Sequence, residues 1–215
     1  MSKVHSWRGI VGSRAIARAR PFNIRSGTAI LHFLVQGRTT LVPVLGYQWA
    51  SDWFAGVTNG VGYNLSSLPQ WPYGLCLVLD MGRTESRSNA LRGLRDIDAK
   101  AEASAFANYA TAGGFFYSST ARYGSGNDGK GLVVDLGVGH GTRLAPHWRL
   151  GMCVGLTLAN AEHMQAYFGV TSRQSLASSY RYFEAGNGIR DVRANVALTH
   201  LYNRRISATL ELSAS

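Results

Sequence analysis

The segment "GSGNDGKG" (residues 124–131) is the stretch whose residue types come nearest to a phosphate-binding loop. It fits the spacing G-x-G-x-x-G and nearly fits G-x-x-x-x-G-K-[ST], in which backbone amides and a lysine surround phosphate oxygens. Gly131, however, stands where a magnesium-binding hydroxyl is required, and Leu132 begins a strand pattern instead of a helix. We interpret the segment as a glycine-rich strand connection and predict no cofactor-binding residues.

A serine hydrolase is the second chemistry that the residue types allow. Glu162 and His163, together with Ser172 or Ser175, could supply a base and a nucleophile. The chain has no G-x-S-x-G motif, and no residue in the sequence is an evident partner that would orient the histidine. We predict no catalytic residues and no enzymatic activity. A barrel-embedded hydrolase of lipid or lipopolysaccharide is kept as an alternative.

Two nearby carboxylates raise the question of a cation site. Asp96 and Asp98 share one face of an expected strand and carry the oxygen ligands that hard cations prefer. A charge inside a barrel that pairs with Arg122 or Arg143 is the better explanation of the two aspartates. We therefore predict no metal ligands.

The net charge of +10 lies mainly near the N-terminus. Residues 1–40 hold seven of the 22 basic residues and no acid, because the first carboxylate is Asp52. This stretch lacks the pattern of a signal peptide. It also lacks the interleaved aromatics and the fold signatures of nucleic-acid binders, so we expect no nucleic-acid partner. Cys76 and Cys153 form no C-x-x-C pair and are expected to be free thiols. We predict a basic tail over residues 1–38, disordered or non-native, and a β-barrel domain over residues 39–215.

A repeat of two residues organises most of the chain after the tail. From Leu132 to Leu144 the even positions are mostly apolar, while the odd positions are glycine, valine or charged. Because successive strand side chains point to opposite faces, this pattern indicates a strand with one apolar face. The same pattern predicts about nine strands. Their expected ranges are 41–49, 53–65, 73–81, 97–109, 115–123, 132–144, 150–162, 189–200 and 206–214.

The lengths and the polar faces of these strands favour a barrel in a membrane. Many reach the roughly 9 to 11 residues that a tilted strand needs to cross a bilayer. Charges among small residues suit a wet interior, with the apolar face turned to lipid. The expected interior charges are Asp80, Lys100, Glu102, Arg122, Asp135, Arg143, Asp191 and Arg193. The expected interfacial aromatics are Trp49, Trp53, Trp71, Tyr73, Tyr109, Trp148 and Tyr167. A soluble ligand-binding barrel, with the apolar face inward, is a further alternative.

The stretch "AYFGVTSRQSLASSYRYFEAGNGIRDV" (residues 166–192) stands in the longest predicted connection. Short and long connections alternate along the chain apart from the tight turn at 50–52, as periplasmic turns and extracellular loops do in outer-membrane barrels. We therefore interpret residues 166–192 as the longest extracellular loop and the start of the next strand. Its candidate partner-contact residues are Tyr167, Phe168, Tyr180, Tyr182 and Phe183.

Three stretches of the chain, residues 41–66, 81–109 and 167–192, resemble successive motifs of the MipA/OmpV family of outer-membrane proteins. The residues that carry the resemblance are Gly62-Tyr63-Asn64, Gly82-Arg83, Leu91, Gly93-Leu94, Asp96-Ile97-Asp98, Tyr167-Phe168-Gly169-Val170, Gly188 and Asp191-Val192. The resemblance covers residues 41 to about 212, in the family's order.

The resemblance implies an antiparallel transmembrane β-barrel of about 10 to 12 strands in the outer membrane, without catalytic residues or cofactors. Its implied partners are outer-membrane lipid, a lytic transglycosylase (MltA) and a penicillin-binding protein, for which the barrel is a peptidoglycan scaffold. Some members are porin-like surface proteins. The chain departs from the family pattern at both ends, and about nine strands leave an edge unpaired in lipid. We therefore expect a truncated or altered chain that needs at least one more strand for closure.

Overall fold

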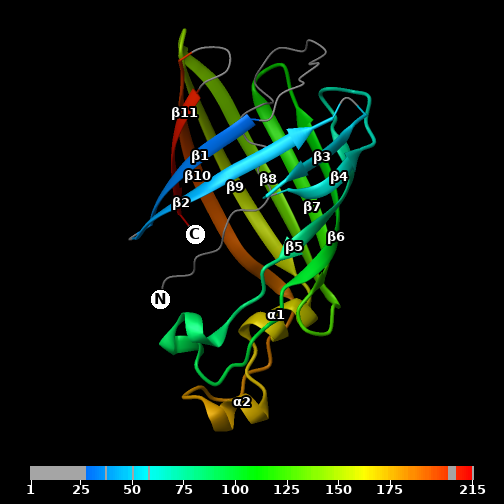
Figure 1. Ribbon diagram of the computed structural model, residues 1–215, viewed down its shortest axis with the longest axis vertical. Coiled ribbons are helices and arrows are strands. Elements are labelled where there is room, and N and C mark those ends of the chain that lie inside the picture. The colour runs from blue at the N-terminus through cyan, green and yellow to red at the C-terminus, as the bar shows by residue number, and fades with distance from the viewer. Residues whose placement is uncertain (1–27, 37, 50, 58, 203–206, 215) are drawn as a thin grey trace.

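The computed structural model describes residues 28–36, 38–49, 51–57, 59–202 and 207–214, and within them the fold is almost entirely β-structure. Eleven strands form one sheet that curls into a barrel (Figure 1). The strands are β1 Thr28–Gln36, β2 Arg38–Gln48, β3 Trp53–Gly56, β4 Gly60–Asn64, β5 Tyr73–Asp80, β6 Lys100–Ala110, β7 Phe115–Ser125, β8 Gly131–Ala145, β9 Trp148–Ala159, β10 Gly188–Leu201 and β11 Ser207–Ala214. The helices are the 3₁₀ turns η1 Glu85–Arg87 and η2 Asn89–Leu91, and α1 Ala161–Phe168 and α2 Ser172–Ala177.

Each strand pairs antiparallel with the next one in the chain, from β1 to β11. The two outermost strands, β1 and β11, then meet in a parallel contact of only two residue pairs, Phe33 with Leu210 and Leu34 with Glu211. We call this contact the seam. The expected all-β antiparallel barrel is therefore confirmed, with the ring completed only through this short join.

The sequence prediction of one strand over residues 53–65 is wrong, because this stretch is the β3–β4 hairpin. Gly56 lies opposite Gly60, and Gly60 has a φ of +68°, which glycine adopts more readily than other residues. Apolar and small residues keep alternating through the turn between β3 and β4, so the sequence pattern alone does not reveal this turn. The hairpin also puts the tight turn after β2 at the same end as the other short turns, although the β3–β4 turn itself is a short connection on the cap side.

The structure has a strand, β1, at Thr28–Gln36, on the tail side of the boundary predicted at residues 38 and 39. Residues 1–27 lie outside the described residues, so the disordered or non-native tail stays a prediction. The described strands number two more than expected because of β1 and the β3–β4 hairpin.

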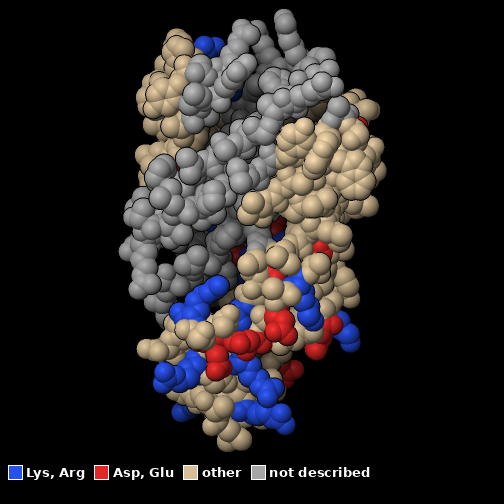
Figure 2. Space-filling model, in the orientation of Figure 1, with Lys and Arg blue, Asp and Glu red and all other residues tan. Residues whose placement is uncertain are grey.

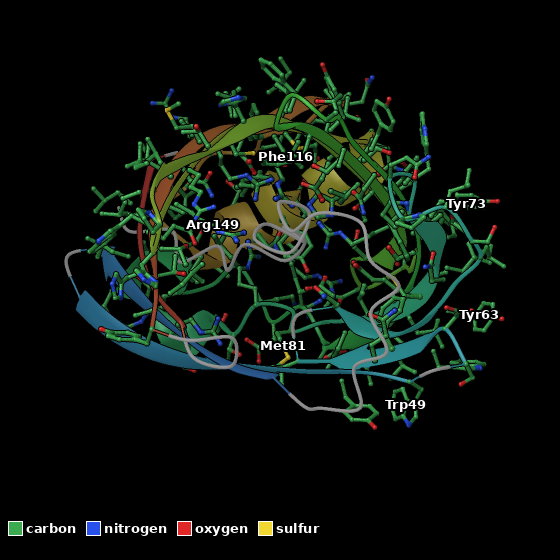
Figure 3. All side chains as sticks on the ribbon, turned by 90° about the horizontal axis from the view of Figure 1, so that it is seen from above. Trp49, Tyr63, Tyr73, Met81, Phe116 and Arg149 are labelled. Atoms are coloured by element: carbon green, nitrogen blue, oxygen red, sulfur yellow. The ribbon has the colours of Figure 1, made fainter. Side chains whose placement is uncertain are left out.

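The alternate strand positions that hold apolar residues face outward, as predicted. Leu77 on β5 is 61% exposed and Val154 on β9 is 52% exposed, while Ser104, Thr157 and Glu102 on the opposite parity are buried. Figure 3 looks along the barrel and shows Tyr63 and Tyr73 outside the ring of strands, with Phe116 and Arg149 inside it. In a soluble ligand-binding barrel with an apolar interior these faces would be reversed. The alternative in which the apolar face lines the interior is therefore wrong.

The two ends of the barrel differ. The connections at 81–99, 126–130 and 160–187 lie at one end, the cap end, where α1 and α2 extend below the strands in Figure 1. The shorter connections at 111–114 and 146–147, with residues 65–72, lie at the opposite turn end. The wall also varies in length, from 4 residues in β3 to 15 in β8. None of the described helices has the length and apolar character needed to span a membrane.

Candidate functional site

The lumen near the cap end contains a group of ion pairs centred on Arg122 of β7. Its guanidinium nitrogens lie 3.3 Å from Glu102 Oε2 on β6 and 3.1 Å from Asp135 Oδ2 on β8. Arg193 of β10 lies 2.8 Å from the other Asp135 oxygen, which also accepts a 2.6 Å hydrogen bond from Thr157 on β9. These side chains join five neighbouring strands, β6 to β10, on the inner face of the wall, and we call them the lumen network together with Arg190 and Asp191.

The network carries balanced charge. Asp191 lies 2.8 Å from Arg193 Nε and 2.8 Å from Arg190 Nε, so three arginines face three carboxylates. A buried charge without a partner costs free energy, and in this network each charged side chain has a partner of opposite charge. The predicted inward position of Glu102, Arg122, Asp135, Asp191 and Arg193 is confirmed.

The predicted pairing of Asp96 or Asp98 with Arg122 or Arg143 is wrong. Both aspartates precede β6 and lie at the cap end, where the Asp96 carboxylate accepts a 2.7 Å hydrogen bond from the Glu85 amide. Arg143 instead donates to the backbone oxygens of Ala145 and Pro146. Within the described part of the chain, no group of acidic, histidine and cysteine side chains is arranged to hold a metal.

The connections 81–99 and 160–187 form the second structured region, which we call the helical cap. Arg83 joins them, because its guanidinium donates to Tyr167 O at 2.6 Å and to Leu94 O at 3.2 Å. Gln174 of α2 donates to the same Leu94 oxygen at 2.5 Å. Segments about 80 positions apart in the sequence are therefore fixed to each other.

Helix α1 is anchored to the barrel by its first turn and by its inner face. Asn160 caps the helix by accepting from His163 N at 3.0 Å, and the same oxygen accepts from Leu132 N on β8 at 2.9 Å. The Tyr167 hydroxyl donates to the Asp80 carboxylate at the end of β5, and its ring stacks on His163 with centroids 4.6 Å apart. Tyr167 is therefore a structural residue of the cap. The sequence prediction that it belongs to an interfacial aromatic girdle is wrong.

His163 lies inside the cap, 5% exposed, with Nδ1 2.7 Å from the hydroxyl of Ser125, which is 2% exposed. Burial, followed by the nearby positive charges of Arg190 and Arg122, lowers the pKa of His163 to about 4. Burial and the hydrogen bond to Asp80 raise the pKa of Tyr167. Both rings are therefore neutral near pH 7.

The hydrolase alternative placed His163 beside Ser172 or Ser175. Ser172 begins α2, and Ser175 lies within the same helix, whereas the serine that contacts the histidine is Ser125 on β7. A substrate cannot reach a pair as deeply buried as Ser125 and His163 without opening the cap. The geometry therefore fits a structural hydrogen bond between α1 and the barrel wall.

Two glycines allow the close approach of the cap segments. Gly82 has a φ of +62°, and a Cβ there would lie 2.0 Å from Ile97 O. Gly93 has a φ of +83°, and a Cβ there would lie 2.2 Å from Ala177 O in α2. Several residues that carry the family resemblance, including Arg83 and Leu94, thus build the helical cap.

The family model described as "MltA-interacting protein MipA" matches residues 32–215, from inside β1 to the last residue. The chain belongs to the MipA family. No curated protein and no solved structure matches it significantly. The family identified from the sequence motifs is confirmed.

The exposed surface of this MipA-family cap differs from the contact surface expected from the sequence. Tyr182 and Phe183 are 57% and 55% exposed, but Tyr167, Phe168 and Tyr180 are only partly accessible. Leu176 of α2, which the sequence did not single out, is 91% exposed. The role of these residues in partner contact stays a prediction.

Aromatic ring pairs gather at the turn end of the MipA-family barrel. Ring pairs follow the strand ends there, with centroids 5.4 Å apart for Trp53 and Tyr63 and 4.3 Å apart for Trp71 and Tyr109. Further pairs at this end are Tyr47 with Trp49, Tyr109 with Tyr117, Phe115 with His140, and Trp148 with His200. Figure 2 shows charged side chains gathered toward the cap end of the visible face, below a tan part of the wall with few charged side chains.

Proposed function

We propose that this MipA-family chain is an outer-membrane β-barrel that acts without catalysis, as a scaffold for peptidoglycan-remodelling enzymes. The family match carries the proposal, because the family is described by its interaction with MltA, a lytic transglycosylase. A penicillin-binding protein is the second enzyme that we propose as a partner. Outer-membrane lipid is the proposed environment of the barrel wall.

The outer wall supports the membrane location. Among the exposed residues of β5 to β10, the only charged one is Arg143, which lies near a turn. An uncharged wall with aromatic residues at one boundary is typical of barrels that lie in lipid. The folded chain should therefore be extracted from outer membranes by detergent and should migrate differently in a gel with and without boiling. Recovery of a soluble periplasmic monomer would contradict this location.

The lumen network supports a scaffold over a porin-like role. Its ion pairs place charged side chains of β6, β7, β8 and β10 inside the lumen close to the cap. We expect the purified barrel in planar bilayers to show no steady conductance of the size that open porins give. Steady conductance through most inserted barrels would instead favour the porin-like alternative.

The proposed orientation puts the turn end in the periplasm, because short turns lie there in bacterial barrels and long connections lie outside. Peptidoglycan enzymes would then reach the connection 65–72 and not the helical cap. This connection is held against β6, since Ala110 N donates to Gln70 O at 3.0 Å, and it exposes Leu68. The exposed cap residues Leu176, Tyr182 and Phe183 would face the cell exterior.

Binding of a purified MltA-type lytic transglycosylase to the barrel in detergent tests the contact. We expect Leu68→Asp to weaken this binding at least tenfold and Leu176→Asp, at an exposed leucine of the cap, to leave it unchanged. The reverse result would assign the contact to the cap and overturn the orientation. No binding to the unsubstituted barrel would contradict the scaffold function.

A further inference from the structure

The helical cap carries a group of exposed arginines, which we call the arginine patch. Its members are Arg92, Arg95, Arg173 and Arg181. Arg92 and Arg95 lie on either side of Gly93 and Leu94, the residues through which the connection 81–99 contacts α2. Arg173 belongs to α2 itself, directly before Gln174, whose side chain donates to Leu94 O. The fold therefore brings arginines from segments about 80 positions apart onto one part of the cap.

The fourth arginine is held near the same helix by a backbone bridge. Val170 and Phe183 exchange hydrogen bonds of 2.8 and 3.0 Å, and this antiparallel pair brings the segment that contains Arg181 back to the start of α2. In Figure 2 the charged side chains farthest from the strands are blue, and the red carboxylates lie closer to the barrel. The outermost part of the cap is therefore positively charged on this face.

The guanidinium groups of the patch are available to a partner. Within the described part of the chain, none of them forms an ion pair or a side-chain hydrogen bond. Of the exposed carboxylates of the cap, Asp96 accepts from the Glu85 amide, and Glu184 accepts from a tyrosine hydroxyl. The two others, Asp98 and Glu162, lie within three residues of β6 and β9. Positive charges that are not neutralised within a surface attract anions to it.

The backbone at Arg95 is a second observation, independent of charge, that points to a binding surface. Its φ is +61°, a left-handed conformation that is uncommon for a residue with a side chain. Glu85 holds the turn, because its carboxylate accepts a 3.1 Å hydrogen bond from the Arg95 amide. Residues held in such unfavourable conformations by a specific contact cluster at sites that bind ligands.

The chemistry of the patch fits a phosphorylated amphiphile. Guanidinium groups bind phosphate through paired hydrogen bonds, so arginine suits this group better than lysine does. Leu176 lies three residues after Arg173 in α2, hence on the same face of the helix, and it is 91% exposed. An apolar side chain beside the arginines favours a ligand that is itself partly apolar over a soluble polyanion.

Lipopolysaccharide combines phosphate groups with apolar chains, and it forms the lipid layer toward which the proposed orientation directs the cap. We propose that the arginine patch binds the phosphate groups of lipopolysaccharide next to the barrel. This assignment rests on the proposed outer-membrane location and goes beyond the scaffold function.

Binding of the purified barrel to lipopolysaccharide in detergent tests the assignment. We expect Arg92→Gln, Arg173→Gln and Arg181→Gln each to weaken binding by about threefold or more, because each removes a guanidinium group from the phosphate. Arg95→Asn should do the same, since asparagine tolerates a positive φ and preserves the turn. The variant with all four changes should bind at least thirtyfold more weakly. Arg143→Gln removes one exposed arginine at the turn end and should leave binding unchanged.

The ligand side of the experiment identifies the group that is bound. Dephosphorylated lipopolysaccharide should bind the unsubstituted barrel at least tenfold more weakly than the intact form. Equal binding of both forms would overturn the proposal, as would equal weakening by Arg143→Gln and by the changes in the patch. Tighter binding of heparin would assign the patch to a soluble polyanion, and equal binding of phosphatidylglycerol would assign it to phospholipids in general. Either result would also overturn the proposal.

The folding of each variant is checked by its heat-modifiable migration, and if the fourfold variant does not fold, the single variants give the decision. All of these measurements use the purified barrel in detergent without an enzyme partner, so a negative result leaves the scaffold function untouched. Extraction from outer membranes is a separate measurement and decides the location on which the proposal rests.

Discussion

Tyr167 is the residue through which helix α1 is fixed to the end of β5. Its hydroxyl donates to the Asp80 carboxylate inside the cap, where solvent replaces the bond poorly. We predict that Tyr167→Phe destabilises the cap by about 1 to 3 kcal/mol, because a partly buried carboxylate loses a hydrogen bond. Faster trypsin cleavage at Arg173 or Arg181 would measure the loss. Tyr182→Phe, at an exposed hydroxyl that donates to Glu184, is the control and should cleave at the original rate.

His163 should make the stability of the barrel depend on pH. Its pKa is about 4 in the folded state against 6.5 for the free side chain, so the unfolded chain binds more protons between these values. Stability should therefore be complete above about pH 6.5 and fall as the pH drops toward 4. The charged groups near the ring are Arg190 and Arg122, which lower the pKa, and Asp80 and Asp135, which raise it.

The thermal unfolding midpoint in detergent, measured from pH 4 to pH 7.5, tests this dependence. We predict that His163→Gln removes most of the slope, while His147→Gln, at an exposed histidine, retains it. An unchanged slope in His163→Gln would show that another group titrates in this window.

The sequence was sufficient to place Glu102, Arg122, Asp135, Asp191 and Arg193 in the lumen, because a period of two assigns each strand residue to one face. Arg143, which the same pattern placed inside, is exposed near a turn, and Arg190 was missed because the register shifts between Ile189 and Asp191.

The sequence could not identify the contact between Ser125 and His163, which are 38 positions apart and belong to different elements. Asp96 and Asp98 were misplaced because the strand pattern was extended backward past Lys100, where β6 begins. Local periodicity contains no information on where tertiary contacts end a strand.

At the scale of elements, the helical cap depends on glycines where two backbones approach closely. We predict that Gly82→Ala lowers the stability of the folded barrel by more than about 1 kcal/mol, because φ is positive and a Cβ would collide with Ile97 O. Gly186→Ala is the matched control, since a Cβ there meets no atom within 4 Å. Unfolding in urea from detergent would measure both. Equal midpoints for the two variants would contradict the close contact.

The strands from β5 to β11 could be predicted to within a few residues, since each carries a long alternation and is bounded by glycine, proline or charged residues. The β3–β4 hairpin could not, because Gly56 and Gly60 fit the small-residue face of a continuous strand. The cap escaped prediction for another reason. Its shape depends on hydrogen bonds such as Gln174 to Leu94, which join distant segments.

At the scale of the whole molecule, the outer wall should tolerate apolar residues and reject charge. Leu77 lies on β5 with its side chain 61% exposed, so arginine there would meet water in a soluble barrel and lipid in a membrane. We predict that Leu77→Arg destabilises the barrel in vesicles by about 2 to 4 kcal/mol. Leu176→Arg on the cap should have no effect. Equal folding of both variants into vesicles would contradict burial of the wall in lipid.

The unequal strand lengths have a consequence for the bilayer in which we propose that the barrel lies. The wall is tall along β8, β9 and β10, with 12 to 15 residues per strand, and low along β3 and β4, with 4 and 5. A bilayer of uniform thickness cannot match both sides, so lipids next to β3 and β4 must thin or the barrel must tilt toward that side. Such a region of compressed lipid would attract short-chain lipids and other proteins with short spans, which gives the barrel a preferred side for lateral neighbours.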